Sequence, residues 1–135
     1  MIQIPAWVDE YVGKPFQEKG RGPGYDCWGL VREVLALEFS VLGLPDYVGA
    51  YSSAFDKESV AAAIEKGLLD GWNQVEKPQA GDLVILRLAG KPWHCGVMVS
   101  EIDMLHIVAG TNACRERLDS LTWRNRIEGY YRYAR

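Results

Sequence analysis

The residues of this chain that are best suited to chemistry are one cysteine and two histidines. Cys27 follows Asp26 at the start of a segment with helical periodicity, so we expect a helix to begin there with Asp26 as its N-cap. The free N–H groups and the positive dipole end of a helix N-terminus favour the thiolate, which attacks carbonyl carbons. His94 can supply a base, and His106 can supply a group that orients this base. These three residues are the minimum set for acyl transfer through a thiol nucleophile.

The segments around these residues resemble those of a known family. They are residues 20–31 (GRGPGYDCWGLV), 78–84 (PQAGDLV), 94–97 (HCGV) and 105–106 (LH), and residues 11–16 (YVGKPF) agree as well. In this order and at this spacing, they resemble the NlpC/P60 cysteine peptidases, above all the short phage-encoded members. The resemblance extends over nearly the whole chain and is far more specific than a single cysteine or a single pair of histidines.

The resemblance implies a fold, an activity and a set of site residues. The fold is α+β and papain-like, with the nucleophile helix packed on an antiparallel meander sheet. The activity is hydrolysis of peptidoglycan stem peptides, typically after D-glutamate at its γ-linkage to the diamino acid, with Cys27, His94 and His106 as catalytic residues. Tyr25 stands where family members have a tyrosine that lines the site, although a packed loop aromatic is a comparable explanation. Trp93, beside His94, is a candidate wall of the substrate cleft.

Length and composition place the chain among soluble globular proteins. Its 135 residues, 48% hydrophobic and 24% charged, fit one domain over residues 1–135. The net charge of −3 argues against a general nucleic-acid binder. No stretch approaches the roughly 20 apolar residues of a membrane span, and no secretory signal is visible. We therefore expect synthesis in the cytoplasm and action at the cell wall, as part of a virion or after release, with peptidoglycan stem peptides and phage tail proteins as partners.

The cysteines do not form a recognisable disulfide or metal pattern. Cys27, Cys95 and Cys114 are an odd number at unrelated spacings, which fits a reducing compartment. Cys95 and Cys114 lie in apolar, strand-like segments, where we expect them to be ordinary buried residues. A zinc site is the alternative, but the chain has no C-x-x-C or H-x-x-x-H pair. We predict neither a metal nor a cofactor.

The expected elements place helices first and strands after them. Helices are predicted over residues 5–12, 27–39 and 56–66, and the apolar residues at 30, 31, 34, 35 and 37 mark the buried face of the second. Strands are predicted over residues 83–86, 94–100, 104–108, 112–118 and 129–133. Their short connections indicate an antiparallel meander, and this order of elements is typical of an α+β protein.

The two histidines require a particular strand register. Side chains alternate with period two along a strand, and His94 and His106 are twelve residues apart. Both rings reach one face only if paired residues have numbers that sum to an even value. This requires a connection with an odd number of residues, for example three around Glu101-Ile102-Asp103. A two-residue hairpin would place the two rings on opposite faces.

Three further interpretations stay open. Six of the nine arginines fall in the last 21 residues (115, 117, 124, 126, 132 and 135); solvated faces are the ordinary explanation, and a carboxylate-binding patch is the alternative. The same fold can perform another acyl transfer, as an amidase or a transferase. A non-enzymatic tail-assembly module is the third possibility, although the presence of Cys27, His94 and His106 argues against it.

Overall fold

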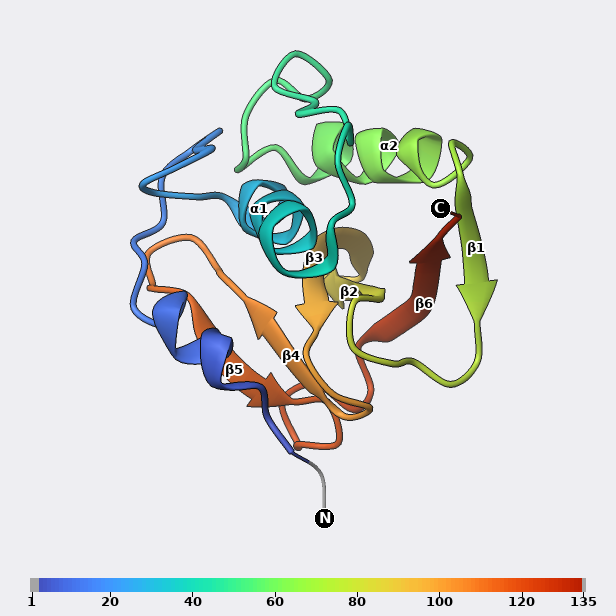
Figure 1. Cartoon of the computed structure of the whole chain (residues 1–135). Coiled ribbons are helices and arrows are strands. Elements are labelled where there is room, and N and C mark those ends of the chain that lie inside the picture. Colours follow the sequence, from blue (N-terminus) through green and yellow to red (C-terminus); the bar gives the residue numbers. More distant parts are fainter. Residues whose placement is uncertain (1–2, 135) are drawn as a thin grey trace.

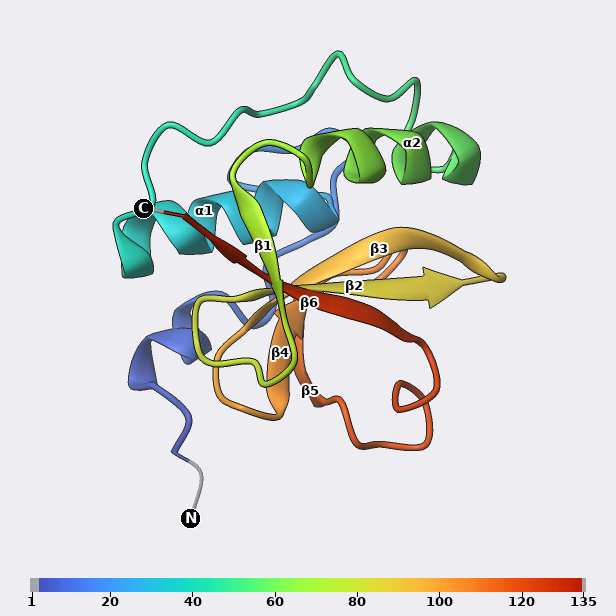
Figure 2. The ribbon, with the colours of Figure 1, turned by 90° about the vertical axis from the view of Figure 1, so that its right-hand side faces the viewer.

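The computed structural model describes residues 3–134, which form a six-stranded antiparallel sheet with two α-helices on one side (Figures 1 and 2). A 3-10 helix, η1 (Ala6–Glu10), precedes the α-helices α1 (Cys27–Phe39) and α2 (Lys57–Gly67). The strands are β1 (Trp72–Val75), β2 (Leu83–Leu88), β3 (Lys91–Met98), β4 (Asp103–His106), β5 (Cys114–Arg117) and β6 (Ile127–Tyr133). The predicted α+β class is confirmed.

The strand order is β1-β6-β2-β3-β4-β5. Strands β2 to β5 follow the chain order that a meander predicts, but β6 returns to pair with β2. Strand β1, which the sequence did not predict, pairs with β6 at the edge of the sheet. Its four residues include only two apolar ones, Trp72 and Val75, so the segment is too short and too polar to show a strand period.

Helix α1 begins and ends as predicted, and its N-cap is Asp26. The Asp26 carboxylate accepts a hydrogen bond from the backbone N–H of Gly29 at 2.8 Å, which satisfies one free donor of the first turn. Leu30, Val31, Val34 and Leu35 are fully buried against the sheet. Leu37, predicted with this face, is instead 64% exposed, because it lies at the edge of the face, about 90° from its centre, and in the last turn of the helix.

Helix α2 covers the sheet beside α1 (Figure 2). Asp56 caps it, as predicted, by accepting a hydrogen bond from the backbone N–H of Ser59 at 3.2 Å. The helix continues through Gly67, one residue past the predicted end, and Leu68 is its C-cap. Val60 is the buried residue of this helix, so α2 rests on the sheet along a narrow apolar face.

The core has two parts. One lies between the helices and the sheet, and it includes Leu83 and Ile85. The other contains Val84, Leu86 and Trp123. Alternate residues of β2 therefore enter different clusters, which explains why this strand appears in the sequence as an uninterrupted apolar run.

The register of β3 and β4 meets the condition set by the two histidines. Val97 pairs with Leu105 and Met98 pairs with Met104, so paired numbers sum to 202, an even value. The turn is centred on Glu101, one residue before the centre that the sequence suggested. The parity prediction is confirmed, and His94 and His106 lie on the same face of the hairpin.

Three of the C-terminal arginines form ion pairs within the chain. Arg115 pairs with Asp103, Arg117 with Asp119 and Arg132 with Asp82, each at 2.8 Å. These pairs favour the interpretation as ordinary surface charge; the arginine at 135 lies outside the described residues. Within residues 3–134, no helix has the length and apolar character needed to cross a bilayer.

Candidate active site

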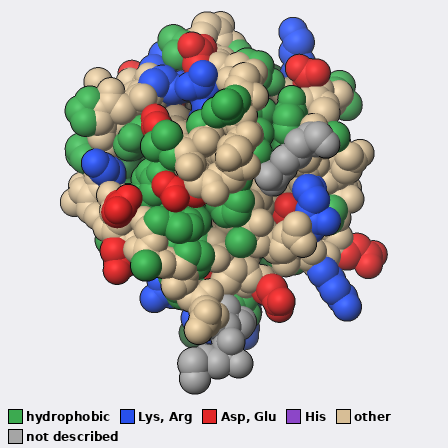
Figure 3. Space-filling model, viewed as in Figure 1, with side chains coloured by type: hydrophobic (Ala, Val, Ile, Leu, Met, Phe, Trp, Pro, Cys, Tyr) green, Lys and Arg blue, Asp and Glu red, His purple; other side chains and the backbone are tan. Residues whose placement is uncertain are grey.

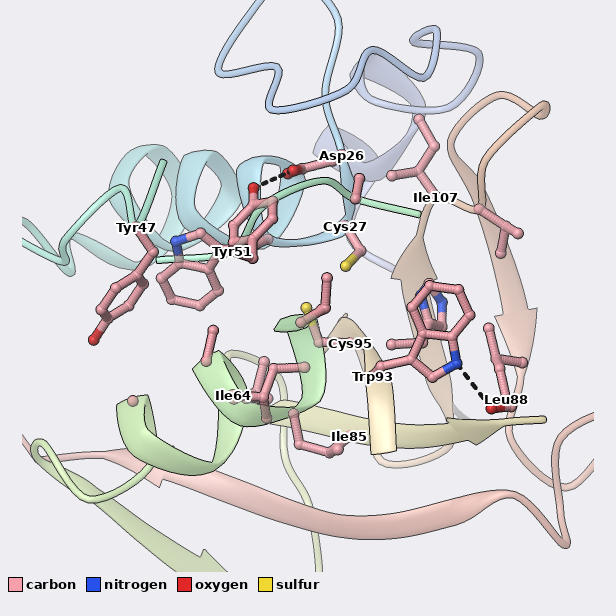
Figure 4. A pocket seen from close by; sticks show the side chains of 18 of the residues that line it. Asp26, Cys27, Tyr47, Tyr51, Ile64, Ile85, Leu88, Trp93, Cys95 and Ile107 are labelled. Atoms are coloured by element: carbon pink, nitrogen blue, oxygen red, sulfur yellow. Dashed lines mark hydrogen bonds between the residues drawn. The ribbon is translucent and has the colours of Figure 1, made fainter. Parts of the chain in front are cut away.

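Cys27 is the first residue of α1, and its side chain points into a pocket where Cys95 of β3 also projects (Figure 4). The pKa of the Cys27 thiol lies well below its ordinary value. The largest cause is a hydrogen bond with the Cys95 thiol, and His94 contributes a further hydrogen bond and positive charge, while burial acts in the opposite direction. The site therefore favours the thiolate at position 27, the nucleophilic form.

His94 and His106 form a directly bonded pair. Nε2 of His94 lies 2.8 Å from Nδ1 of His106. Both rings are buried, at 4% and 1% exposure, and no histidine is visible on the face drawn in Figure 3. A side chain at Gly96 would crowd this pair, because its Cβ would lie 3.2 Å from Cβ of His106. The absence of a side chain at Gly96 of β3 thus leaves room for His106 beside His94.

A carboxylate continues the series beyond the two histidines. Nε2 of His106 lies 2.5 Å from Oε2 of Glu116, and the Trp123 indole N–H donates to the same oxygen at 3.0 Å. An ionised carboxylate only accepts, so Nε2 of His106 carries the proton and Nδ1 is left to accept from His94. Glu116 therefore selects the tautomer of His106 that orients the His94 ring, whose Nδ1 is the nitrogen free to meet Cys27.

The electrostatics keep His106 neutral. Burial, together with the positive charge of His94, lowers the pKa of His106 to about 4, although Glu116 opposes this shift. Burial would raise the pKa of Glu116, but hydrogen bonds from His106 and Trp123 outweigh it and lower the pKa. The result is one neutral imidazole between a second imidazole and an ionised carboxylate.

The low pKa of His106 predicts a pH-dependent stability. In the unfolded chain its pKa returns to about 6.5, so the unfolded state binds more protons than the folded state between pH 6.5 and about 4. The free energy of unfolding should therefore fall as the pH drops through this window, by about 3 kcal/mol for this group. Urea unfolding of the wild type and of His106→Asn at pH 7, 5.5 and 4 measures it. Parallel pH dependence in the two proteins would contradict the assignment.

Sequence reasoning missed Glu116 and Trp123. Glu116 is an even number of residues from His106, and β4 pairs with β5 so that His106 faces Cys114. Glu116 therefore lies on the His106 side of the hairpin, which alternation would have predicted had the register been known. Trp123 stacks on His94, with ring centroids 5.8 Å apart and 25° between the planes. It lies in a turn segment without a strand period, so the sequence carried no signal for its position.

The two predicted substrate-binding aromatics have different surroundings. Trp93 lines the pocket, and its indole N–H donates to the backbone oxygen of Leu88 at 2.8 Å (Figure 4). Tyr25 is 6% exposed and packs in the core between helices and sheet, and its own side chain does not line the pocket. The structure thus brings Trp93 to the site, whereas the role of Tyr25 at the substrate stays a prediction.

Cys114 lies beside the far end of the histidine series. Its sulfur is 3.6 Å from Nε2 of His106, so it is not the isolated core residue that the sequence suggested. His106, Cys114 and Glu116 each offer one donor atom, and these atoms lie within 4.8 Å of one another. This set could hold a metal ion, but it uses the Nε2 and Oε2 atoms that already bond to each other.

The three thiols should differ in reactivity. Cys27 is half-buried with a lowered pKa, whereas the pKa of Cys95 is raised well above its ordinary value by the hydrogen bond with Cys27 and by burial. Burial and the Glu116 charge raise the pKa of Cys114. We expect iodoacetamide at neutral pH to label Cys27 first, as peptide mass mapping over time would show. Faster labelling of Cys95 or Cys114 in the folded protein would be incompatible with this site.

A thiolate at a helix N-terminus, with an oriented imidazole beside it, can attack a carbonyl carbon and transfer an acyl group. Arg21 and Tyr51 fix the carboxylate that caps this helix: Nη1 of Arg21 donates to Asp26 at 2.9 Å, and the Tyr51 hydroxyl donates to it as well. The cap of the helix that carries Cys27 is therefore held by polar contacts from Arg21 and Tyr51.

Solved structures with the same fold include three NlpC/P60 proteins. A lipoprotein-like protein from Staphylococcus aureus has a TM-score of 0.65 and 23% identity over 95% of this chain and 39% of its own. The NlpC/p60 domain of the peptidoglycan hydrolase SagA has a TM-score of 0.58 and 17% identity over 93% of this chain and 92% of its own. A protein from Bacillus cereus has a TM-score of 0.63 and 19% identity over 99% of this chain and 42% of its own.

The chain therefore spans about two-fifths of the first and third proteins, and these low identities show the fold alone. Among curated proteins, none matches the chain. The family assignment comes from the sequence model of the NlpC/P60 family, which matches residues 13–132. Because this match extends over most of the chain, the chain belongs to the NlpC/P60 family.

Proposed function

We propose that the protein is a cell-wall hydrolase that cleaves peptidoglycan stem peptides by cysteine catalysis, at the γ-D-glutamyl bond to the diamino acid. The main evidence for cysteine catalysis is the chain of hydrogen bonds from His94 through His106 to Glu116, next to a Cys27 thiol of lowered pKa. Membership of the NlpC/P60 family and the fold shared with the SagA peptidoglycan hydrolase domain support the substrate class.

In the proposed mechanism, Cys27 and His94 form a thiolate–imidazolium pair. The thiolate attacks the peptide carbonyl, and the backbone N–H of Cys27 at the helix start donates to the developing oxyanion. His94 then protonates the leaving amine, which breaks the C–N bond and leaves a thioester. Water, deprotonated by His94, hydrolyses the thioester and frees Cys27. His106 acts as a positioning residue, because Nδ1 of its neutral ring accepts a hydrogen bond from Nε2–H of His94 during every step.

Glu116 is a second positioning residue in this proposal. Glu116→Ala removes the carboxylate that fixes the His106 tautomer, so we expect kcat/KM to fall about tenfold to 100-fold. Glu116→Gln can accept the same hydrogen bond from Nε2–H of His106 and should recover part of the loss. Glu128→Ala, which removes a surface partner of Arg87, is the matched control and should leave the rate unchanged. Equal losses for Glu116→Ala and Glu128→Ala would exclude a specific role for Glu116.

We further propose that the protein reaches the wall in a virion or after release, with phage tail proteins as partners. This rests on the resemblance of residues 11–31 to short phage-encoded members of the family.

Digestion of purified sacculi tests the proposed function. We expect the wild type to release fragments with new termini at the γ-D-glutamyl bond, identified by mass spectrometry, and Cys27→Ser to release none. Activity should survive EDTA. Cleavage at another amide would indicate the amidase alternative, and loss of activity with a stoichiometric zinc would indicate a metal enzyme. Intact sacculi together with an unreactive Cys27 would favour the tail-assembly alternative.

A further inference from the structure

The pocket beside Cys27 is lined almost entirely by apolar side chains. It lies between α1, α2, the loop before α2 and strands β2 and β3, and its empty space is about 960 Å³, with the solvent-open part included. Among the described residues that line it, none is a lysine, arginine, serine, threonine, asparagine or glutamine. Its ionisable side chains are Asp26, Cys27, His94, Cys95 and two tyrosines.

Three polar groups of the walls form hydrogen bonds with the protein. The indole N–H of Trp28 donates to the backbone oxygen of Pro45 at 3.1 Å, and that of Trp93 donates to Leu88 at 2.8 Å. The Tyr51 hydroxyl bonds to Asp26 (Figure 4). The indoles of Trp28 and Trp93 therefore offer carbon surface to the pocket, and the thiols of Cys27 and Cys95 lie in the middle of these walls in Figure 4.

This lining suits one class of acyl group better than others. A carboxylate bound here would meet no cationic lining residue except a protonated His94, and the negatively charged Asp26 would repel it. Asp26 itself is already paired with Arg21 at 2.9 Å. An aliphatic chain bound here would instead remove from water both its own apolar surface and that of the pocket walls. The pocket therefore favours an uncharged, apolar group, unlike the polar γ-D-glutamyl group of the proposed peptide substrate.

We propose that Cys27 also hydrolyses oxygen esters whose acyl part is an aliphatic chain, and that the pocket binds this chain. The inference rests on the thiol chemistry of the proposed function and goes beyond its peptide substrate. The Cys27 sulfur bonds to the acyl carbon, the bond from that carbon to the leaving oxygen breaks, and the leaving alcohol takes the His94 proton. Water then attacks the thioester and gives a proton to His94, and the chain leaves as a carboxylic acid.

The chain-length profile of ester hydrolysis tests the proposal. Rates for p-nitrophenyl acetate, butyrate and octanoate are measured with the wild type, and the rates with Cys27→Ser are subtracted. Each buried methylene is expected to raise kcat/KM about threefold to fourfold, which gives about 100-fold between butyrate and octanoate. A flat or falling profile overturns the proposal.

A pair of neighbouring alanines on α2 supplies matched variants. Ala63 lines the pocket, whereas Ala62 is exposed on the same helix. Ala63→Phe should lower the octanoate-to-acetate ratio of kcat/KM at least tenfold, and Ala62→Phe should leave this ratio at the wild-type value. Equal ratios for the two variants would show that the acyl chain of the ester does not bind in this pocket and would overturn the proposal.

A measurement on the wild type alone makes the test independent of folding in the variants. 1-Octanol should slow the labelling of Cys27 by iodoacetamide at least fivefold, whereas ethanol at the same concentration should not; no protection by octanol counts against the proposal. Digestion of sacculi with a flat chain-length profile would overturn this inference and leave the proposed function in place. Preference for octanoate with intact sacculi would support the inference and count against the peptide substrate.

Discussion

His94→Ala is expected to lower kcat/KM for the cleaved peptide about 10³-fold or more and to approach Cys27→Ser in severity. The variant loses both the base and the partner of the thiolate, and general acid–base contributions run to about 10²–10⁴-fold. Losses within one catalytic unit are not additive, so the double variant should be little worse than either single one. Because His94 contributes to the low pKa of Cys27, the variant should also raise the pH at which Cys27 alkylates.

His106 variants provide the control for this result. His106→Ala removes the orienting ring but leaves the base, so its loss should be smaller, and its effect on the Cys27 pKa should be modest. His106→Asn can still accept the hydrogen bond from His94 and should recover part of the activity. Thermal unfolding of each variant separates catalytic loss from loss of fold. A His94→Ala protein that hydrolyses its substrate at nearly the wild-type rate would refute the proposed site.

Gly29→Ala is expected to lower the free energy of unfolding by at least about 3 kcal/mol, with a corresponding loss of folded protein. On an open helix the same change would stabilise by about 1 kcal/mol. Here the added Cβ would lie only 2.0 Å from the backbone oxygen of Gly20. That oxygen also accepts a hydrogen bond from Arg21, which in turn holds Asp26, so the loop cannot move without disturbing the cap of α1. Overpacking against fixed backbone exceeds the gain in propensity.

Gly49→Ala is the matched control for the glycine experiment. A Cβ at Gly49 would meet nothing within 4 Å, so we expect a change of less than about 1 kcal/mol. Guanidinium unfolding followed by tryptophan fluorescence measures both variants. A Gly29→Ala protein as stable as Gly49→Ala would show that the loop at Gly20 can relax. The nucleophile helix would then be less rigidly seated than the contacts indicate.

Local pattern determined much of the fold. The capping aspartates and the apolar periods set the starts of α1 and α2, because an N-cap depends on residues within one turn. The apolar runs around Leu83 and Val97 predicted β2 and β3. The strand β1 and the position of β6 in the sheet depended on the whole molecule. β1 is held in the sheet by its pairing with β6. In the sheet, β6 lies beside β2 and not beside β5, the strand that precedes it in the sequence. Pairings between distant segments leave no local period in the sequence.

For the candidate site, the sequence by itself pointed to the three residues Cys27, His94 and His106 and to the hairpin parity that both rings need to share one face. Tertiary structure alone decided that Glu116 ends the series, that Cys95 faces Cys27 and that the adjacent pocket is apolar. The reason is physical. Helix capping and strand alternation act between near neighbours in the chain, whereas a hydrogen bond from His106 to Glu116 or a contact between two thiols depends on strand register and helix docking, which the full set of packing contacts fixes.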